Sequence, residues 1–310
     1  MAEPDLAVDV GGGLTLRNPV IAASGTFGYG LEFAGVTDLT AIGAIVVKGL
    51  SLEPHRGHPA PRILETAGGL LNAIGLQNVG VRAFVEEKLP LLREIGTPIV
   101  ANCWGHVPEE FAEVGARLAD ADGLAAVELN VSCPNKREWG RIIATDPDLT
   151  RQVVRAVRAR CRLPLWVKLS PNVTDITSIA RVAEEEGADA VSLVNTFVGL
   201  AVDLETRRPV LTNGTGGLSG PAIKPIALRM VHDTARAVKI PVIGMGGIGD
   251  ADDALEFLLV GARAVQVGTA SFVDPRATER IAAGIAAGLR RRGYADVNQW
   301  IGTLRAPPGR

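Results

Sequence analysis

The sequence is poor in aromatic residues and in cysteine. Phe, Trp and Tyr together make up 4% of the chain, and cysteine occurs 3 times in 310 residues. Cys103, Cys133 and Cys161 are odd in number and widely spaced, which suits neither a disulfide framework nor a metal site. They are also fewer than the four thiolates that an ordinary iron–sulfur cluster takes. We therefore expect no metal in this chain.

Strong charge and membrane-directed segments are absent as well. The formal net charge of −2 gives no electrostatic reason to expect nucleic acid or an anionic membrane as a partner. No uncharged apolar run approaches the roughly 18 residues that cross a bilayer. The first residues, MAEPDLAVDV, lack the basic and apolar regions of a signal peptide. The sequence thus predicts a cytoplasmic protein.

Short apolar runs rich in Val and Ile alternate with helical patterns along the whole chain. These runs are nearly continuous, as expected for parallel strands that are buried on both faces. The chain also holds 36 glycines, which fits many tight turns between strands and helices. The predicted strands are Pro19–Ala23, Ala44–Lys48, Pro98–Asn102, Ala125–Asn130, Leu165–Leu169, Ala190–Asn195, Val242–Met245 and Ala264–Val267.

Helix signals separate these strands. Asp146 and Asp250 are predicted N-caps, Pro108 begins another helix, and Ile281 belongs to the apolar stripe of a last helix. Strands alternating with helices over this length favour a (β/α)8 barrel as a single domain over residues 1–310, although they also allow a doubly wound sheet. Two connections, from Gly49 to about Val81 and Thr196–Gly220, are long enough to cover a site at the barrel mouth.

Polar residues stand at the ends of five predicted strands: Lys48, Asn102, Asn130, Lys168 and Asn195. Each one alone could be a loop-capping amide or a surface lysine. If the barrel closes, however, all five meet at one rim, and barrel enzymes carry out their chemistry there.

Asparagine is frequent at this predicted rim, at Asn72, Asn130, Asn135 and Asn195. Carboxamides offer both donors and acceptors without charge, so they suit a planar ligand with alternating N–H and C=O groups. The alternative is asparagine in turns, which is what we expect at Asn213-Gly214.

Cys133 follows a strand directly, in Asn130-Val131-Ser132-Cys133-Pro134-Asn135. A free thiol has a pKa near about 8.5, so a modest shift makes it a general base at neutral pH. It could also be a nucleophile, although this segment holds no histidine to activate it. Cys103 and Cys161 are interpreted as small buried apolar residues.

A glycine-rich turn, Gly244-Met245-Gly246-Gly247-Ile248-Gly249, lies between a predicted strand and a helix. Its backbone N–H groups and the helix dipole favour binding of a phosphate group. The turn Gly268-Thr269-Ala270 after the last strand would form the other half of this phosphate site. A Rossmann interpretation is weak, because no acidic residue ends the next strand.

Taken together, these segments resemble the dihydroorotate dehydrogenases, and specifically the catalytic subunits of class 1B. The resemblance runs from Asn18-Pro19 to Ala270. Departures are small: Val79 stands where proline is expected, and Phe197 where an aliphatic residue is usual. The matching stretches are ASGTFGYG at Ala23–Gly30, KGLSLEP at Lys48–Pro54, LLNAIGLQN at Leu70–Asn78, NVSCPN at Asn130–Asn135, VKLSPN at Val167–Asn172, NTFVG at Asn195–Gly199, NGTGGLSGPAIKP at Asn213–Pro225 and GMGGI at Gly244–Ile248.

The resemblance implies FMN at the barrel mouth and dihydroorotate beside it. The residues implied for FMN are Ser24, Lys48, Gly49, Asn102, Asn130, Lys168, Val194, Gly220, Gly246, Gly247, Gly268 and Thr269. Those implied for the substrate are Lys48, Asn72, Ala73, Ile74, Gly75, Leu76, Asn130, Asn135, Asn195 and Thr196. Cys133 would take the proton from C5 of dihydroorotate while hydride leaves C6 for the flavin, which gives orotate for pyrimidine (UMP) biosynthesis.

Class 1B resemblance also implies a partner subunit that carries FAD and a [2Fe–2S] cluster and passes electrons to NAD. A homodimer of this chain would join such subunits in a heterotetramer. Cysteine at 133 and the lack of an N-terminal extension argue against class 2, and Asn135 argues against dihydropyrimidine dehydrogenases. Fumarate as the acceptor, as in class 1A, fits the ASGTFGYG and KGLSLEP stretches less well.

Three rival classes remain open. One is another FMN barrel, such as a dihydropyrimidine dehydrogenase or a dihydrouridine synthase acting on transfer RNA. The second is a non-redox isomerase or aldolase that uses Lys48 or Lys168 as a base or Schiff-base former. The third is a catalytically inactive regulatory barrel. The colour of the purified protein separates the flavin enzymes from the second class.

Overall fold

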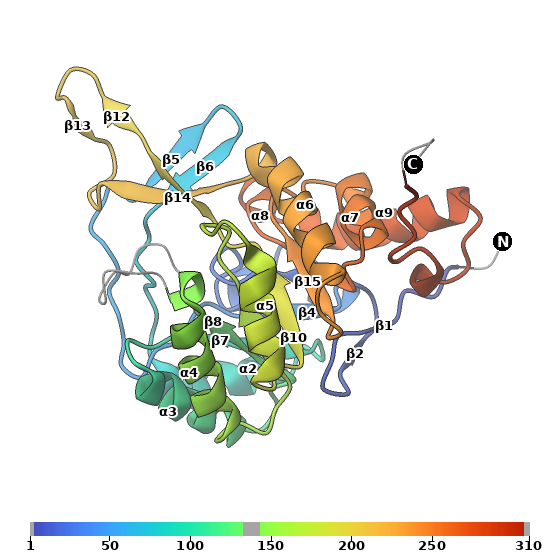
Figure 1. Ribbon diagram of the computed structural model, residues 1–310, viewed down its shortest axis with the longest axis horizontal. Coiled ribbons are helices and arrows are strands. Elements are labelled where there is room, and N and C mark those ends of the chain that lie inside the picture. Colours follow the sequence, from blue (N-terminus) through green and yellow to red (C-terminus); the bar gives the residue numbers. More distant parts are fainter. Residues whose placement is uncertain (1–2, 133–142, 307–310) are drawn as a thin grey trace.

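Eight parallel strands close into a barrel in the part of the chain that the computed structural model describes, residues 3–132 and 143–306 (Figure 1). The barrel strands are β3 (Val20–Ala22), β4 (Ala44–Val46), β7 (Ile99–Cys103), β8 (Ala126–Asn130), β9 (Leu165–Lys168), β10 (Ala190–Leu193), β15 (Val242–Met245) and β16 (Ala264–Val267).

Their spatial order is β10-β15-β16-β3-β4-β7-β8-β9, and β9 pairs with β10. The eight predicted strands and the (β/α)8 barrel are therefore confirmed. The first and last barrel strands, β3 and β16, pair through Val20 and Val265, so the sheet is closed and the doubly wound alternative is wrong.

Helices cover the outside of the barrel, with α3, α4 and α5 side by side along one flank (Figure 1). The helices are α1 (Val81–Ala83), α2 (Leu89–Arg93), α3 (Pro108–Ala119), α4 (Pro147–Arg158), α5 (Ile176–Glu185), α6 (Lys224–Ala235), α7 (Ala251–Leu259), α8 (Ala270–Val273) and α9 (Ala277–Arg291). Shorter turns are η1 (Leu31–Phe33), η2 (Leu39–Ala41), the π-helical η3 (Phe84–Lys88), η4 (Ile143–Thr145), η5 (Pro221–Ile223) and η6 (Val297–Gln299).

The predicted helix starts are confirmed at the level of single hydrogen bonds. The Asp146 carboxylate accepts from the N–H groups of Asp148 and Leu149, and Asp250 accepts from the N–H of Asp253. These bonds satisfy amide donors that the first helical turn leaves without a partner. No helix in the described ranges is long and apolar enough to cross a membrane.

The two long connections build a second, antiparallel sheet beside the barrel mouth (Figure 1). Its strands have the order β11-β14-β6-β5, so strands from the first connection pair with strands from the second. The remaining strands form two small hairpins. The bounds are β1 (Val8–Asp9), β2 (Thr15–Leu16), β5 (Ile63–Thr66), β6 (Gly69–Asn72), β11 (Phe197–Leu200), β12 (Val202–Asp203), β13 (Arg208–Pro209) and β14 (Thr215–Ser219).

Cys103 and Cys161 are free thiols that are buried in the core. Burial raises the pKa of both, because the thiolate loses its hydration. Both are thus structural, as predicted. The predicted turn at Asn213-Gly214 is also confirmed: Gly214 has a φ of 82° and its N–H donates to the Leu211 carbonyl.

Candidate functional site

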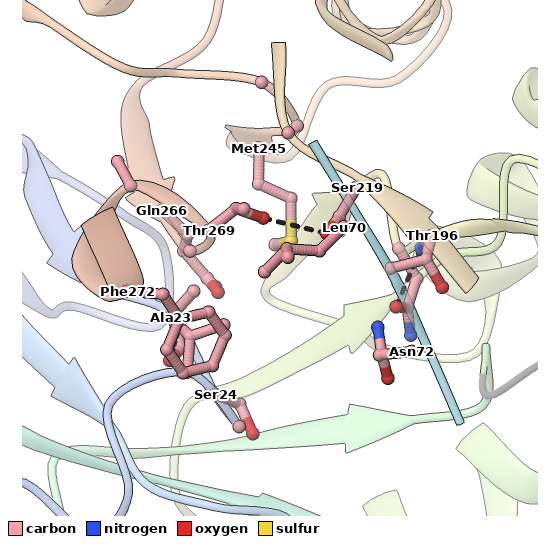
Figure 2. A pocket seen from close by; sticks show the side chains of 18 of the residues that line it. Ala23, Ser24, Leu70, Asn72, Thr196, Ser219, Met245, Gln266, Thr269 and Phe272 are labelled. Atoms are coloured by element: carbon pink, nitrogen blue, oxygen red, sulfur yellow. Dashed lines mark hydrogen bonds between the residues drawn. The ribbon is translucent and has the colours of Figure 1, made fainter. Parts of the chain in front are cut away.

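The carboxyl ends of the barrel strands open into a cavity of about 440 Å³, within the range of about 300–1,000 Å³ that small-molecule sites occupy. Figure 2 shows Asn72 and Thr196 on one side of it and Gln266 and Thr269 on the other. Of the residues predicted for the site, the cavity is lined by Ser24, Lys48, Gly49, Asn72, Ile74, Gly75, Leu76, Asn130, Lys168, Val194, Asn195, Thr196, Gly220, Gly246, Gly247, Gly268 and Thr269.

Four predicted residues do not belong to this lining as the structure describes it. Asn102 is fully buried beneath the cavity, and Ala73 packs with Leu71 and Leu211 in a small apolar cluster. The roles of these two residues toward a ligand stay predictions, and Asn102 Oδ1 has no hydrogen-bond partner among the described residues. Cys133 and Asn135 lie outside the described residues, so their roles stay predictions.

A chain of polar side chains connects β8 to the end of β10. The Asn195 Nδ2 donates to Ser132 Oγ at 2.8 Å, and Ser132 Oγ donates to Asn130 Oδ1 at 3.1 Å. Ser132 thereby orients both carboxamides. Because the Asn130 oxygen already accepts a hydrogen bond, a ligand in the cavity would contact the Asn130 NH₂ group. Since Ser132 directly precedes Cys133, the backbone reaches this cluster one residue before the predicted base.

Glu128 is a polar residue of the site that the sequence analysis missed. It lies on β8 with 0% exposure and accepts hydrogen bonds from Asn102, Ser192 and Gln266. Because β16 and β8 are not neighbours in the barrel, the bond from Gln266 crosses the barrel interior. The available signal was a carboxylate inside an otherwise apolar strand, a position that needs several hydrogen-bond partners.

The loop that ends with Leu76 is held from behind by a histidine. The His58 N–H donates to the Ile74 carbonyl at 3.0 Å, and a ring nitrogen of His58 lies 3.0 Å from the Ala73 carbonyl. Gly75 has a φ of 77°, and a Cβ there would lie 2.7 Å from the His58 nitrogen. This part of the cavity wall therefore requires glycine.

Lys48 provides a cation at the end of β4, partly buried in the cavity wall. Burial lowers the pKa of this ammonium, and the positive charge of Arg62 lowers it further, while Glu32 acts in the opposite direction. A cation placed beside uncharged amides suits an anionic group on a planar ligand.

Two glycines shape the cavity wall beyond β15. Gly246 and Gly247 have φ values of 119° and 79°, which side chains rarely adopt. Close to this turn, the Thr269 hydroxyl donates to Ser219 Oγ at 2.8 Å (Figure 2). A bare backbone turn beside Gly268-Thr269 suits a phosphate group, and the amides and Lys168 suit a planar polar ring.

Replacing Gly247 with alanine is expected to weaken binding of a phosphate-bearing ligand at this turn about tenfold, since a left-handed non-glycine residue costs about 1–2 kcal/mol. The new Cβ would also lie 2.8 Å from the Lys224 nitrogen and 2.9 Å from the Gly220 oxygen. Fluorescence titration of the apoprotein with FMN measures the loss. Gly249→Ala is the matched control, because its nearest atom is the end of the Asp253 side chain at 3.5 Å; equal losses in both variants would contradict the assignment.

Comparison with known proteins agrees with this geometry. The family model described as dihydroorotate dehydrogenase matches residues 6–289. A relative from Trichlorobacter lovleyi is 58% identical over 302 residues, 97% of this chain and 99% of its own length. A relative from Geobacter sulfurreducens is 58% identical over 304 residues, with 98% and 99% covered. Both are named dihydroorotate dehydrogenase B (NAD(+)), catalytic subunit. This chain belongs to the dihydroorotate dehydrogenase family.

Proposed function

We propose that this chain is an FMN-dependent dihydroorotate dehydrogenase, which oxidises (S)-dihydroorotate to orotate in de novo pyrimidine biosynthesis. Membership of the family implies a flavin cofactor. FMN is the form that we infer, because the turns at Gly246-Gly247 and Gly268-Thr269 suit a single phosphate. The observation that carries the proposal is that amides and lysines from stretches far apart in the sequence line one cavity at the barrel mouth.

Residues of this chain are assigned to proton removal, to the charge on the flavin and to binding of the pyrimidine. When bound, the flavin supplies the acceptor for the hydride that leaves C6 of dihydroorotate. Cys133 removes the proton from C5, and the order Asn130, Ser132, Cys133 along the chain supports a place for it beside the ring. Lys168, which is 6% exposed, offsets negative charge on the flavin. Asn72, Asn195 and Thr196 hold the pyrimidine.

Lys48 binds the carboxylate of the substrate as an ammonium ion. Binding is therefore present below the Lys48 pKa and is lost as the pH rises through it. Because this pKa is lowered by burial and by Arg62, the loss occurs at a lower pH than for a free lysine.

Replacing Arg62 with methionine is expected to move the alkaline limb of kcat/KM to higher pH, since the variant removes a charge that lowers the Lys48 pKa. The pH profile for dihydroorotate measures the shift. Arg62→Lys is the control, because it keeps the positive charge and should leave the limb near its original position. A limb that stays in place in both variants would contradict the role of Lys48.

We further propose that the chain is one FMN-binding domain over residues 1–310 and that it works with a partner subunit in the cytoplasm. The names of the relatives, which specify a catalytic subunit and NAD(+), support a partner. On this proposal, a homodimer of this chain joins FAD- and [2Fe–2S]-carrying subunits in a heterotetramer, and these pass the electrons to NAD.

The purified chain tests the function directly. It should be yellow and should convert dihydroorotate to orotate with an artificial electron acceptor, which is followed by the absorbance of orotate. NAD should serve as the acceptor only when the partner subunit is added, and fumarate should be a poor acceptor. A colourless chain would favour a non-redox barrel, and a yellow chain that ignores dihydroorotate would favour another flavin barrel.

A further inference from the structure

A single carboxylate lies at the centre of the polar layer beneath the cavity. Glu128 Oε1 accepts from Asn102 Nδ2 at 2.7 Å. Its Oε2 accepts from Ser192 Oγ at 2.7 Å and from Gln266 Nε2 at 2.6 Å. A fully buried carboxylate is costly unless such donors surround it, and a neutral side chain of similar size often serves stability equally well. The charge itself therefore calls for an explanation.

The carboxylate determines how two amides are turned. An ionised carboxylate only accepts hydrogen bonds, so Asn102 and Gln266 must direct their NH₂ groups toward it. Their oxygens, Asn102 Oδ1 and Gln266 Oε1, are buried and have no hydrogen-bond partner among the described residues. Gln266 lines the cavity, and Asn102 Oδ1 lies 2.7 Å from where a Cβ on Gly49 would be.

Lys168 completes the group. Its Nζ lies 3.9 Å from Glu128 Oε1, which is longer than the 2.7–2.9 Å or so of a direct charged hydrogen bond. At this separation the ammonium is attracted by the carboxylate, and its N–H donors remain available for a ligand. Lys168 also lines the cavity, so one anion and one cation lie close together at its floor.

We propose that Glu128 is a positioning residue of the flavin site. It acts through Lys168 and the two amides: it orients them, and its negative charge offsets the Lys168 cation beneath the ring. This assignment rests on the proposed flavin-binding function. A nearby anion disfavours the electron-rich, reduced flavin, so Glu128 keeps the reduction potential lower than the lysine alone would set it.

The test is the potential of the bound flavin in Glu128→Gln, measured by reductive titration against a reference dye without dihydroorotate. Loss of the charge should favour binding of reduced over oxidised FMN by about tenfold or more. For a two-electron couple, a tenfold change raises the reduction potential of the bound flavin by about 30 mV. Ser192→Ala is the matched control, because it removes one hydrogen bond from the same carboxylate and keeps the charge. Glu128→Asp should restore most of the wild-type potential.

A second pair of variants covers the case in which Glu128→Gln does not fold. Lys168→Gln is compared with the double variant Lys168→Gln/Glu128→Gln, which leaves no unpaired buried charge, both with FMN in excess. The flavin potential of the double variant should exceed that of Lys168→Gln by the same amount, about 30 mV. Two results would overturn the assignment of Glu128 and leave the proposed function standing. One is a Glu128→Gln variant whose flavin potential equals that of the flavin-bound wild type. The other is equal flavin potentials in Lys168→Gln and in the double variant. A wild type that binds no flavin would overturn the proposed function and this assignment with it.

Discussion

Replacing Cys133 with serine is expected to slow dihydroorotate oxidation by about 10²–10⁴-fold, the contribution typical of a general base, while FMN stays bound. A serine hydroxyl is a far weaker proton acceptor than a thiolate, whose ordinary pKa is about 8.5. The remaining activity should therefore have its pH optimum at higher pH. Stopped-flow reduction of the flavin by dihydroorotate measures this step, and flavin absorbance measures retention.

Cys161→Ala is the matched control for this experiment. Cys161 is a buried thiol just beyond the end of α4, and burial raises its pKa, so it takes no part in proton transfer. Its replacement should leave the rate of flavin reduction unchanged. If Cys133→Ser reduces the flavin at the wild-type rate with the same pH profile, Cys133 is not the base.

Replacing Lys168 with alanine is expected to weaken FMN binding by about ten- to a hundredfold, because a hydrogen bond to a charged group contributes about 1.5–3 kcal/mol. The same change leaves Glu128 as a buried anion without the cation 3.9 Å away. That uncompensated charge also lowers the free energy of unfolding. The flavin content of the purified protein and titration of the apoprotein with FMN measure the effect.

Lys239→Ala provides the control for the loss of a lysine. Lys239 is exposed and precedes β15, so it lies at the end of the barrel opposite the cavity. Its replacement should leave flavin content unchanged. Full flavin retention together with normal activity in Lys168→Ala would count against the placement of this residue under the ring.

The barrel was predictable because parallel strands that are covered on both faces are apolar throughout. All eight strands were found within a few residues of their observed bounds. Asp146 and Asp250 were equally readable, since an N-cap acts on amides only two or three residues away. The sheet beside the mouth was not predicted. Leu70 and Ser219 pair across it, and no local pattern records which of two distant connections will meet.

The site was predictable where a polar residue ends a strand. Lys48, Asn130, Lys168 and Asn195 all reach the cavity, because closure of the barrel brings the carboxyl ends of its strands together. Asn102 shares this strand-end pattern, and the family resemblance assigned it to the flavin; its NH₂ group donates to Glu128 inside the barrel, and its role toward a ligand stays a prediction. The position of Asn102 near the end of its strand predicted how deep the side chain lies. Its hydrogen-bond partner, Glu128, belongs to a neighbouring strand, so the position could not predict that partner.

The sequence by itself determined the barrel, the rim that carries the chemistry and the family resemblance, because each depends on short-range patterns or on motifs that stand in order along the chain. Only the tertiary structure showed that Glu128 joins Asn102, Ser192 and Gln266. These contacts link β7, β8, β10 and β16, and the bond from Gln266 crosses the inside of the closed barrel. Such an arrangement exists only once the ends of the sheet have met, so it leaves no signal in any single segment.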